Sequence, residues 1–202
     1  KLGVEKLGPR AAEIDKSGEF PWDIVKILGE NGILQLPLPE KYGGIGADVT
    51  TLCMVAEELA RFCTTSSTLV CIQGSNLKVI SLGGSESQKD RFFQRMAKGD
   101  QITAFALTEP GAGSDVGSMK TRAVRRGDMY ILNGTKCFIS GGGVADLLPL
   151  FAMTDPAKGL KGGISAFVLE KDTPGFRIGK TEEKMGEKGV PAYELILEDA
   201  QI

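Results

Sequence analysis

One segment of the chain begins with a short apolar run and continues with glycines, hydroxyl-bearing residues and acids: Phe105-Ala106-Leu107-Thr108-Glu109-Pro110-Gly111-Ala112-Gly113-Ser114-Asp115. Glycine lets other groups approach the main chain closely, so such a loop exposes backbone N–H groups and suits a polar or anionic ligand. The loop is not the dinucleotide fingerprint G-x-G-x-x-G, because glycines stand at 111 and 113 but position 116 is Val. No P-loop lysine follows either.

The composition excludes several kinds of chemistry. The chain has no histidine, so the commonest general base and the commonest metal ligand are missing, and a Ser-His-Asp triad is excluded. The cysteines contain no C-x-x-C pair, which argues against a zinc or iron site; they are Cys53, Cys63, Cys71 and Cys137. We therefore expect no metal, and hydrolase activities lose most of their support.

Charge and hydropathy limit the partners and the compartment. The net charge of −2, from 24 basic and 26 acidic residues, gives no electrostatic footprint for nucleic acid or an acidic membrane. No apolar run approaches the length of a membrane span, and no signal peptide is visible. Three cysteines stand in apolar helical surroundings, where reduced thiols are usual, so we expect a reducing compartment: the bacterial cytoplasm or the mitochondrial matrix.

Apolar residues recur at helical spacing before Gly99-Asp100. Pro21 suits the first turn of a helix whose apolar stripe would be Trp22, Val25, Ile27 and Leu28. Further helical patterns begin at Asp48 and cover Leu69 to Leu82. The sequence Ser85-Glu86-Ser87-Gln88 predicts a capping box at the start of another helix, which Gly99 ends.

After Asp100 the pattern changes to strands. Candidate strands cover residues 102–107, 121–125, 129–132, 135–140, 147–153, 164–170 and 193–197. The pair Asn133-Gly134 predicts a tight turn between two of them. Strands in a row without helices between them favour an antiparallel sheet or barrel over a Rossmann sheet. The chain has 202 residues and 42% hydrophobic content, which is enough for a core in one or two domains. We predict an α+β protein with an N-terminal all-α helical domain over residues 1–100, followed by a small antiparallel β-barrel domain over residues 101–202.

The segment Thr108-Glu109-Pro110-Gly111-Ala112-Gly113-Ser114-Asp115, placed at the start of the β region, resembles the flavin-binding signature of the acyl-CoA dehydrogenases. Other segments are similar to that family in the same order: Leu38-Pro39-Glu40-Lys41-Tyr42-Gly43-Gly44, Asn133-Gly134-Thr135-Lys136-Cys137-Phe138-Ile139-Ser140, Gly163 to Lys171 with Thr173-Pro174-Gly175-Phe176, and Glu198-Asp199. The resemblance covers nearly the whole chain, and several ordered matches are more specific than one glycine motif.

The resemblance implies an FAD-dependent oxidation of an acyl-CoA at Cα–Cβ, in which a base takes the α-proton and hydride leaves Cβ for flavin N5. The flavin carries that chemistry, and the protein orients it and tunes its electrons. The resemblance also implies an electron-transfer flavoprotein as electron acceptor, a homotetramer, and a role in fatty acid or amino acid catabolism.

Site residues follow from the resemblance one by one. Leu107 and Thr108 would contact the pyrimidine edge of the flavin, and Phe105 would stand beside its ring. Gly113 and Ser114 would lie where the cofactor and the acyl-CoA meet, with Ser114 contacting the substrate. The second flavin segment would supply three further contacts: Phe138, Ile139 and Ser140. Phe138 replaces a frequent tryptophan, and Ser140 replaces a frequent threonine whose hydroxyl approaches N5. Taken alone, Thr108 and Ser114 are also ordinary turn or cap residues.

Two features depart from the family pattern. Lys188 replaces an arginine, and Val190, Pro191 and Ala192 offer no hydroxyl where the family carries serine or threonine. The family's catalytic glutamate lies in a C-terminal helical domain, and the sequence stops at Ile202 before any such domain. We therefore expect the base outside this chain and nominate no catalytic residue in it; Glu109 is interpreted as a structural part of the motif.

Two other functions compete with the dehydrogenase. One is an oxygen-using relative on the same scaffold, an acyl-CoA oxidase or a flavin monooxygenase, which would reoxidise its reduced flavin in air. The other is a truncated module that binds acyl-CoA or a protein without catalysis.

Overall fold

The computed structural model describes residues 1–202, which form two compact units. The first unit contains residues 1–102 together with 184–191, and the second contains 103–183 together with 192–202. Two compact units do not by themselves establish two domains, so the predicted domain boundary at residue 100 stays a prediction. No helix is long and apolar enough to cross a membrane.

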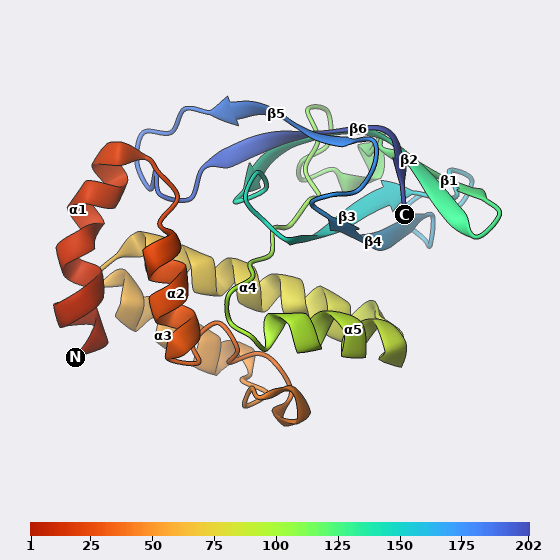
Figure 1. Ribbon diagram of the computed structural model, residues 1–202. Helices are drawn as coiled ribbons and strands as arrows, with labels where there is room; N and C mark the ends of the chain where they lie inside the picture. The colour runs from red at the N-terminus through yellow and green to blue at the C-terminus, as the bar shows by residue number, and fades with distance from the viewer. The chain divides into compact units, whose positions relative to one another are not determined.

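The first unit is helical (Figure 1). Its α-helices are α1 (Gly8–Ser17), α2 (Trp22–Glu30), α3 (Val49–Ala60), α4 (Thr64–Gly83) and α5 (Glu86–Met96), with short turns η1 (Gly3–Leu7) and η2 (Glu40–Tyr42). The Asp48 side chain caps α3 by accepting from the Thr51 N–H at 2.8 Å. The predicted capping box at the start of α5 is confirmed, since Ser85 and Gln88 each accept from the other's backbone N–H.

Burial explains the helical pattern and corrects one detail of it. Helix α4 buries Leu69, Val70, Leu77 and Ile80. Helix α2 buries Ile24, Val25 and Leu28, but the predicted stripe residue Trp22 is exposed. Its ring instead packs edge-on against Phe20, with ring centroids 4.9 Å apart, because position 22 opens the helix on its solvent side.

Residues 184–191 belong to the helical unit although they lie between two strands in the sequence. The Lys188 N–H donates to Asp15 Oδ1 at 3.0 Å, and the Thr68 hydroxyl donates to the Glu187 carboxylate. Gly189 lies so close to the helices that a Cβ atom there would stand 2.2 Å from Ile14 Cγ2. The segment that departs from the family pattern in sequence therefore completes the packing of these helices.

The second unit is built on one six-stranded sheet in the order β4-β3-β1-β2-β6-β5. The strands are β1 (Arg122–Arg126), β2 (Met129–Ser140), β3 (Leu147–Met153), β4 (Ile164–Glu170), β5 (Phe176–Glu182) and β6 (Ala192–Gln201). The predicted α+β class is confirmed, but the sheet differs from an antiparallel barrel in two details. It is not closed, because β4 and β5 form its two edges and do not pair with each other, and β1 pairs parallel with β3. The sequence pattern also missed β5, whose residues are mostly exposed.

The predicted strand at 102–107 follows the same edge of β3 as β1 does. Thr103 and Ala106 make parallel bridges to Leu147 and Leu150. The Ala104 N–H donates to Leu147 O at 3.1 Å, and the Ala106 N–H donates to Pro149 O at 2.9 Å. This strand-like segment leads directly into the glycine-rich loop, so β3 fixes where that loop begins.

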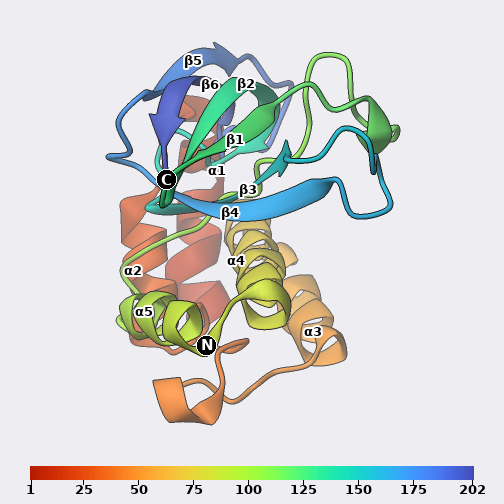
Figure 2. The same ribbon diagram turned by 90° about the vertical axis from the view of Figure 1, so that its right-hand side faces the viewer.

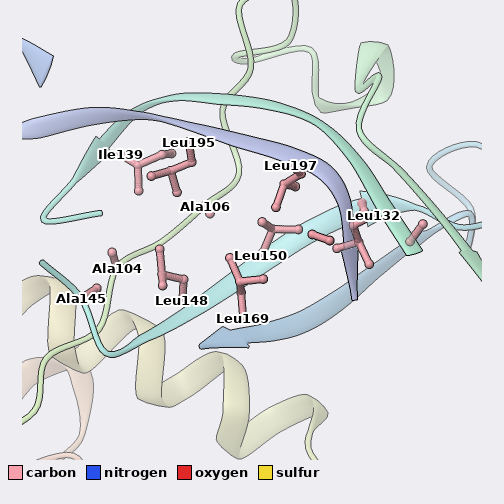
Figure 3. Close-up of a cluster of buried hydrophobic side chains, with 13 residues drawn as sticks. Ala104, Ala106, Leu132, Ile139, Ala145, Leu148, Leu150, Leu169, Leu195 and Leu197 are labelled. Carbon is pink, nitrogen blue, oxygen red and sulfur yellow. The ribbon is translucent and has the colours of Figure 1, made fainter. Parts of the chain in front are cut away.

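The core of the second unit lies between two layers of the strongly coiled sheet. Figure 2 shows β3 and β4 as one layer, and β1, β2 and β6 as the other. Figure 3 shows that leucines and an isoleucine from both layers point toward one another across the gap: Leu132, Ile139, Leu148, Leu150, Leu169, Leu195 and Leu197. Ala104 and Ala106 fill the space beside them, so the entering segment is held by the core as well as by β3.

The predicted tight turn at Asn133-Gly134 is wrong, because β2 continues through both residues. A register shift against β6 falls between Leu132 and Gly134, so the pair marks an irregularity of the strand. The Asn133 amide bonds Asp199 twice, to its carboxylate and to its N–H, each at 2.9 Å. Gly134 has φ of +154°, and a Cβ there would stand 2.4 Å from Thr121 Oγ1, so only glycine fits.

Candidate functional site

The glycine-rich loop is closed by its own backbone and attached to β2. Glu109 and Ala112 exchange N–H to carbonyl bonds of 3.0 and 3.1 Å, which form a tight turn. The Cys137 N–H donates to Thr108 O at 2.9 Å. The two predicted flavin segments, 105–114 and 138–140, are thereby placed side by side at the end of β2.

A buried ion pair holds the same two segments together. Lys136 Nζ lies 2.7 Å from Glu109 Oε1, and the side chains are 0% and 5% exposed. The Lys136 ammonium also donates to Leu107 O at 3.0 Å. The Glu109 carboxylate accepts from the Lys120 N–H at 2.7 Å and from the Thr121 N–H at 3.1 Å. Three separate stretches of chain therefore meet at one pair of charges.

The surroundings of this pair lower the pKa of both partners, which favours the charged form of Glu109 and opposes that of Lys136. Burial opposes ionisation of Glu109, but the hydrogen bonds from Lys136, Thr121 and Lys120 outweigh it and hold the pKa of the carboxyl below its usual value. Burial also lowers the pKa of the Lys136 ammonium, and Glu109 opposes that change. A carboxylate already saturated by donors is a poor proton acceptor, so the structural interpretation of Glu109 agrees with its geometry.

The first segment presents polar groups that have no partner in the protein. Leu107 and Thr108 are half-buried, and their backbone N–H groups and the Thr108 hydroxyl donate to no protein acceptor. Gly113 and Ser114 are exposed beyond them. Phe105 is 36% exposed and packs against Phe151, with ring centroids 5.3 Å apart. The loop therefore offers donors and an aromatic face to a ligand.

The second segment presents an aromatic ring from a strained backbone. Phe138 has φ of +58° and its side chain is 64% exposed. A register shift between Lys136 and Ile139 produces this conformation and turns the ring away from the core. Such a conformation costs roughly 1–3 kcal/mol for a residue other than glycine and is found preferentially at ligand sites.

The other two residues of this segment differ from Phe138 in burial. The Ile139 side chain is 2% exposed and belongs to the core, and its carbonyl accepts from the Gly142 N–H at 3.0 Å, so the side chain is not presented to a ligand. Ser140 is half-buried at the end of β2. The Cys137–Thr108 hydrogen bond thus places the partner-free donors of Leu107 and Thr108 near the exposed ring of Phe138, and donors beside an aromatic ring suit a planar ligand with a polar edge.

The sequence pattern missed Lys136 as a member of the site. A lysine between Thr135 and Cys137 in a strand suggests a solvent-facing position, yet Lys136 is fully buried. The available signal was the pairing of one acid in a glycine-rich loop with one lysine in a largely apolar strand. No group of three or more histidine, cysteine or acidic side chains is placed to hold a metal ion.

Comparison with known proteins gives matches over nearly the whole chain. Residues 1–100 match the family model described as the acyl-CoA dehydrogenase N-terminal domain, and residues 104–200 match the acyl-CoA dehydrogenase middle domain. Among curated proteins, cyclohex-1-ene-1-carbonyl-CoA dehydrogenase of Syntrophus aciditrophicus is 45% identical over 100% of this chain and 49% of its own length. The short-chain specific acyl-CoA dehydrogenase of Clostridium acetobutylicum is 45% identical over 98% of this chain and 52% of its own length.

Solved structures share the fold. Butyryl-CoA dehydrogenase from Megasphaera elsdenii is 38% identical, with a TM-score of 0.92, and this chain covers 54% of it. A glutaryl-CoA dehydrogenase from Mycobacterium smegmatis in complex with FADH2 is 33% identical, with a TM-score of 0.89 and 50% covered. A chain of a structure reported as the electron transferring flavoprotein of Acidaminococcus fermentans is 40% identical, with a TM-score of 0.94 and 53% covered. All of this chain is matched in each, and it spans about half the length of its relatives.

Proposed function

Because the chain belongs to the acyl-CoA dehydrogenase family, we propose that the intact protein binds FAD and oxidises an acyl-CoA thioester to the 2,3-enoyl-CoA. The observation that carries this proposal is the junction of the two predicted flavin segments. Partner-free donors of Leu107 and Thr108 lie beside the exposed ring of Phe138, and the ion pair of Lys136 with Glu109 fixes them there.

In this proposal FAD supplies the hydride-accepting group when it is bound. The Leu107 and Thr108 N–H groups and the Thr108 hydroxyl donate to the pyrimidine edge, where negative charge develops on reduction. Phe138 and Phe105 provide apolar faces that exclude water from the ring. Ile139 contributes main-chain contacts, and the Ser140 hydroxyl stands at the end of the same strand.

The substrate side of the site is proposed to begin at Gly113 and Ser114. Both are exposed at the far end of the loop, and a Cβ at Gly113 would meet no atom within 4 Å. Ser114 can donate or accept a hydrogen bond, which suits a thioester or an amide of the acyl-CoA. The base that takes the α-proton is proposed to lie outside residues 1–202, since Glu109 is already engaged.

Partners are proposed on the same basis. The similarity to a chain of the electron transferring flavoprotein structure supports an electron-transfer flavoprotein as acceptor. We propose a homotetramer in the bacterial cytoplasm or the mitochondrial matrix, with a role in fatty acid or amino acid catabolism.

The test is cofactor content of the purified intact protein and its Phe138→Ala variant. The wild-type protein should show a flavin absorption spectrum and release FAD on denaturation, and acyl-CoA should bleach that spectrum anaerobically. Phe138→Ala should retain less FAD, whereas the control Met129→Ala, also an exposed apolar residue of β2, should retain as much as wild type. Colourless protein that FAD cannot reconstitute would refute the proposal.

A further inference from the structure

The peptide between Leu107 and Thr108 contacts the one lysine that is fully buried in this chain. Lys136 Nζ donates to Leu107 O at 3.0 Å, and its other acceptor is the Glu109 carboxylate at 2.7 Å. The N–H of the same peptide unit belongs to Thr108, and it donates to no protein acceptor. One end of this peptide is therefore bonded to a cation while the other end is free for a ligand.

We propose that Lys136 is a positioning residue that polarises the Leu107–Thr108 peptide and so makes the Thr108 N–H a stronger donor to an acceptor carrying negative charge. Resting on the proposed function, this inference identifies that acceptor as the reduced flavin. Lys136 acts through the peptide and touches neither cofactor nor substrate.

The physical reason is cooperativity within one amide group. A carbonyl that accepts a charge-assisted hydrogen bond loses electron density to the donor, and the nitrogen of that amide then holds its proton less tightly. In a low-dielectric environment, bonds in such a chain strengthen one another by about 10–30% each. A donor strengthened in this way binds the anionic form of an acceptor more tightly than the neutral form.

The geometry keeps the ammonium in place. The Lys136 side chain is 0% exposed, so no water competes for its protons. Its partner Glu109 is fixed in turn by the backbone N–H groups of Lys120 and Thr121. The Cys137 N–H holds the carbonyl of Thr108 on the other side. The peptide cannot rotate away from the ammonium without breaking several of these bonds together.

The first test needs no cofactor, because it observes the peptide itself. Leu107-Thr108 is the only Leu-Thr pair in residues 1–202, so labelling with carbonyl-13C leucine and 15N threonine gives one directly bonded 13C–15N amide there. Its signal in the intact, deuterated protein is assigned by its loss in Thr108→Ser. We expect the Thr108 amide proton to move upfield in K136M, with FAD removed as well as with FAD bound.

Two variants make this test decisive. The double variant E109Q/K136M removes both charges together, so it leaves no unpaired buried charge if K136M alone does not fold. The matched control K171M deletes a partly exposed lysine that pairs with Asp146 at 2.9 Å in the same unit. The signal should move in the double variant and stay in K171M. A signal at the wild-type position in E109Q/K136M overturns the proposal.

The second test measures the midpoint potential of bound FAD in the same proteins. If the reduced flavin loses tenfold more affinity than the oxidised flavin, the two-electron potential falls by about 30 mV. We expect a fall of this size in E109Q/K136M and none in K171M. If Lys136 only held the loop in shape, FAD retention would drop and the potential of the FAD that remains would not change.

The two proposals fail separately. If the wild-type protein binds no FAD, the proposed function fails, and the Thr108 amide signal still decides whether Lys136 polarises the peptide. If FAD binds but neither the signal nor the potential moves in E109Q/K136M, the proposed function stands and the present inference is refuted.

Discussion

Gly134→Ala should damage the fold and the candidate site together. Gly134 has φ of +154°, and a Cβ would stand 2.4 Å from Thr121 Oγ1, 2.7 Å from its Cα and 2.8 Å from its Cβ. The backbone conformation costs alanine roughly 1–3 kcal/mol. Displacing Thr121 adds about 1–3 kcal/mol of overpacking, because its Cα belongs to the backbone and cannot rotate away.

The control is Gly127→Ala in the hairpin between β1 and β2. Gly127 has φ of +64°, and a Cβ there would meet no atom within 4 Å. Alanine at this position should cost about 1–2 kcal/mol, from the left-handed backbone alone. Any loss of stability in Gly134→Ala beyond the range expected for the backbone alone therefore reports the contact of position 134 with Thr121.

Urea unfolding and hydrogen exchange of β1 and β2 peptides measure both costs. We expect faster exchange in Gly134→Ala than in Gly127→Ala, and a lower urea midpoint. FAD content should fall only in Gly134→Ala, because the Thr121 N–H donates to the Glu109 carboxylate that anchors the loop. Equal losses of stability in the two variants would refute the reasoning, since they would show that the contact with Thr121 costs nothing.

Four further outcomes are expected. Lys136→Met should cost about 3–5 kcal/mol of unfolding free energy, E109Q/K136M should recover most of it, and the control K171M, whose lysine is 58% exposed, should cost less than Lys136→Met in the same urea titration. Because the folded-state pKa of Glu109 is depressed below its ordinary 4.5, its stabilising contribution is present above that value and is lost as the pH falls through the folded pKa. The stability difference between wild type and Glu109→Gln, measured by urea unfolding, should therefore be full at neutral pH and shrink in acid; a difference that is constant with pH would contradict this. Thr108→Val should lower the flavin reduction potential and slow reductive turnover by less than the roughly 3 kcal/mol typical of one lost donor, because backbone donors remain; an unchanged potential in an FAD-loaded variant would exclude this role for the hydroxyl. Residues 1–202 mixed with FAD and a panel of acyl-CoAs should show no substrate-dependent flavin reduction, because the base, which must come within roughly 3 Å of the α-proton, is proposed to lie outside these residues; reduction at the rate of the intact protein would show that the base is among these residues.

The helices could be predicted from the sequence because their signals are local. Asp48 and the Ser85 capping box mark helix starts by bonding to N–H groups within three residues. All strands except β5 could be recognised from the sequence, but their arrangement depends on distant pairing. No local sequence signal predicts that Arg122 pairs in parallel with Met153. The same is true of the position of β5 at the edge of the sheet, beside β6.

The sequence predicted the two segments of the candidate site but not the contacts that join them. The composition of the polar loop predicts exposed backbone donors. It does not predict that Glu109 forms an ion pair with a lysine 27 residues away in the sequence. Asn133-Gly134 was misinterpreted for a related reason. The same dipeptide permits a tight turn or a bulge, and the choice depends on Thr121, which directly precedes β1, and on Asp199 in β6.

The segment 184–191 has a consequence for how the protein is made. The chain enters the sheet unit after Ile102, leaves it for the helices after Glu183, and returns to it after Pro191. During synthesis the helices emerge first, yet the residues that seal Ile14 and Thr65 appear only after β5 has been translated. The helical unit can therefore complete its packing only after residues 184–191 have emerged, so its last step of folding depends on a contact between distant parts of the chain.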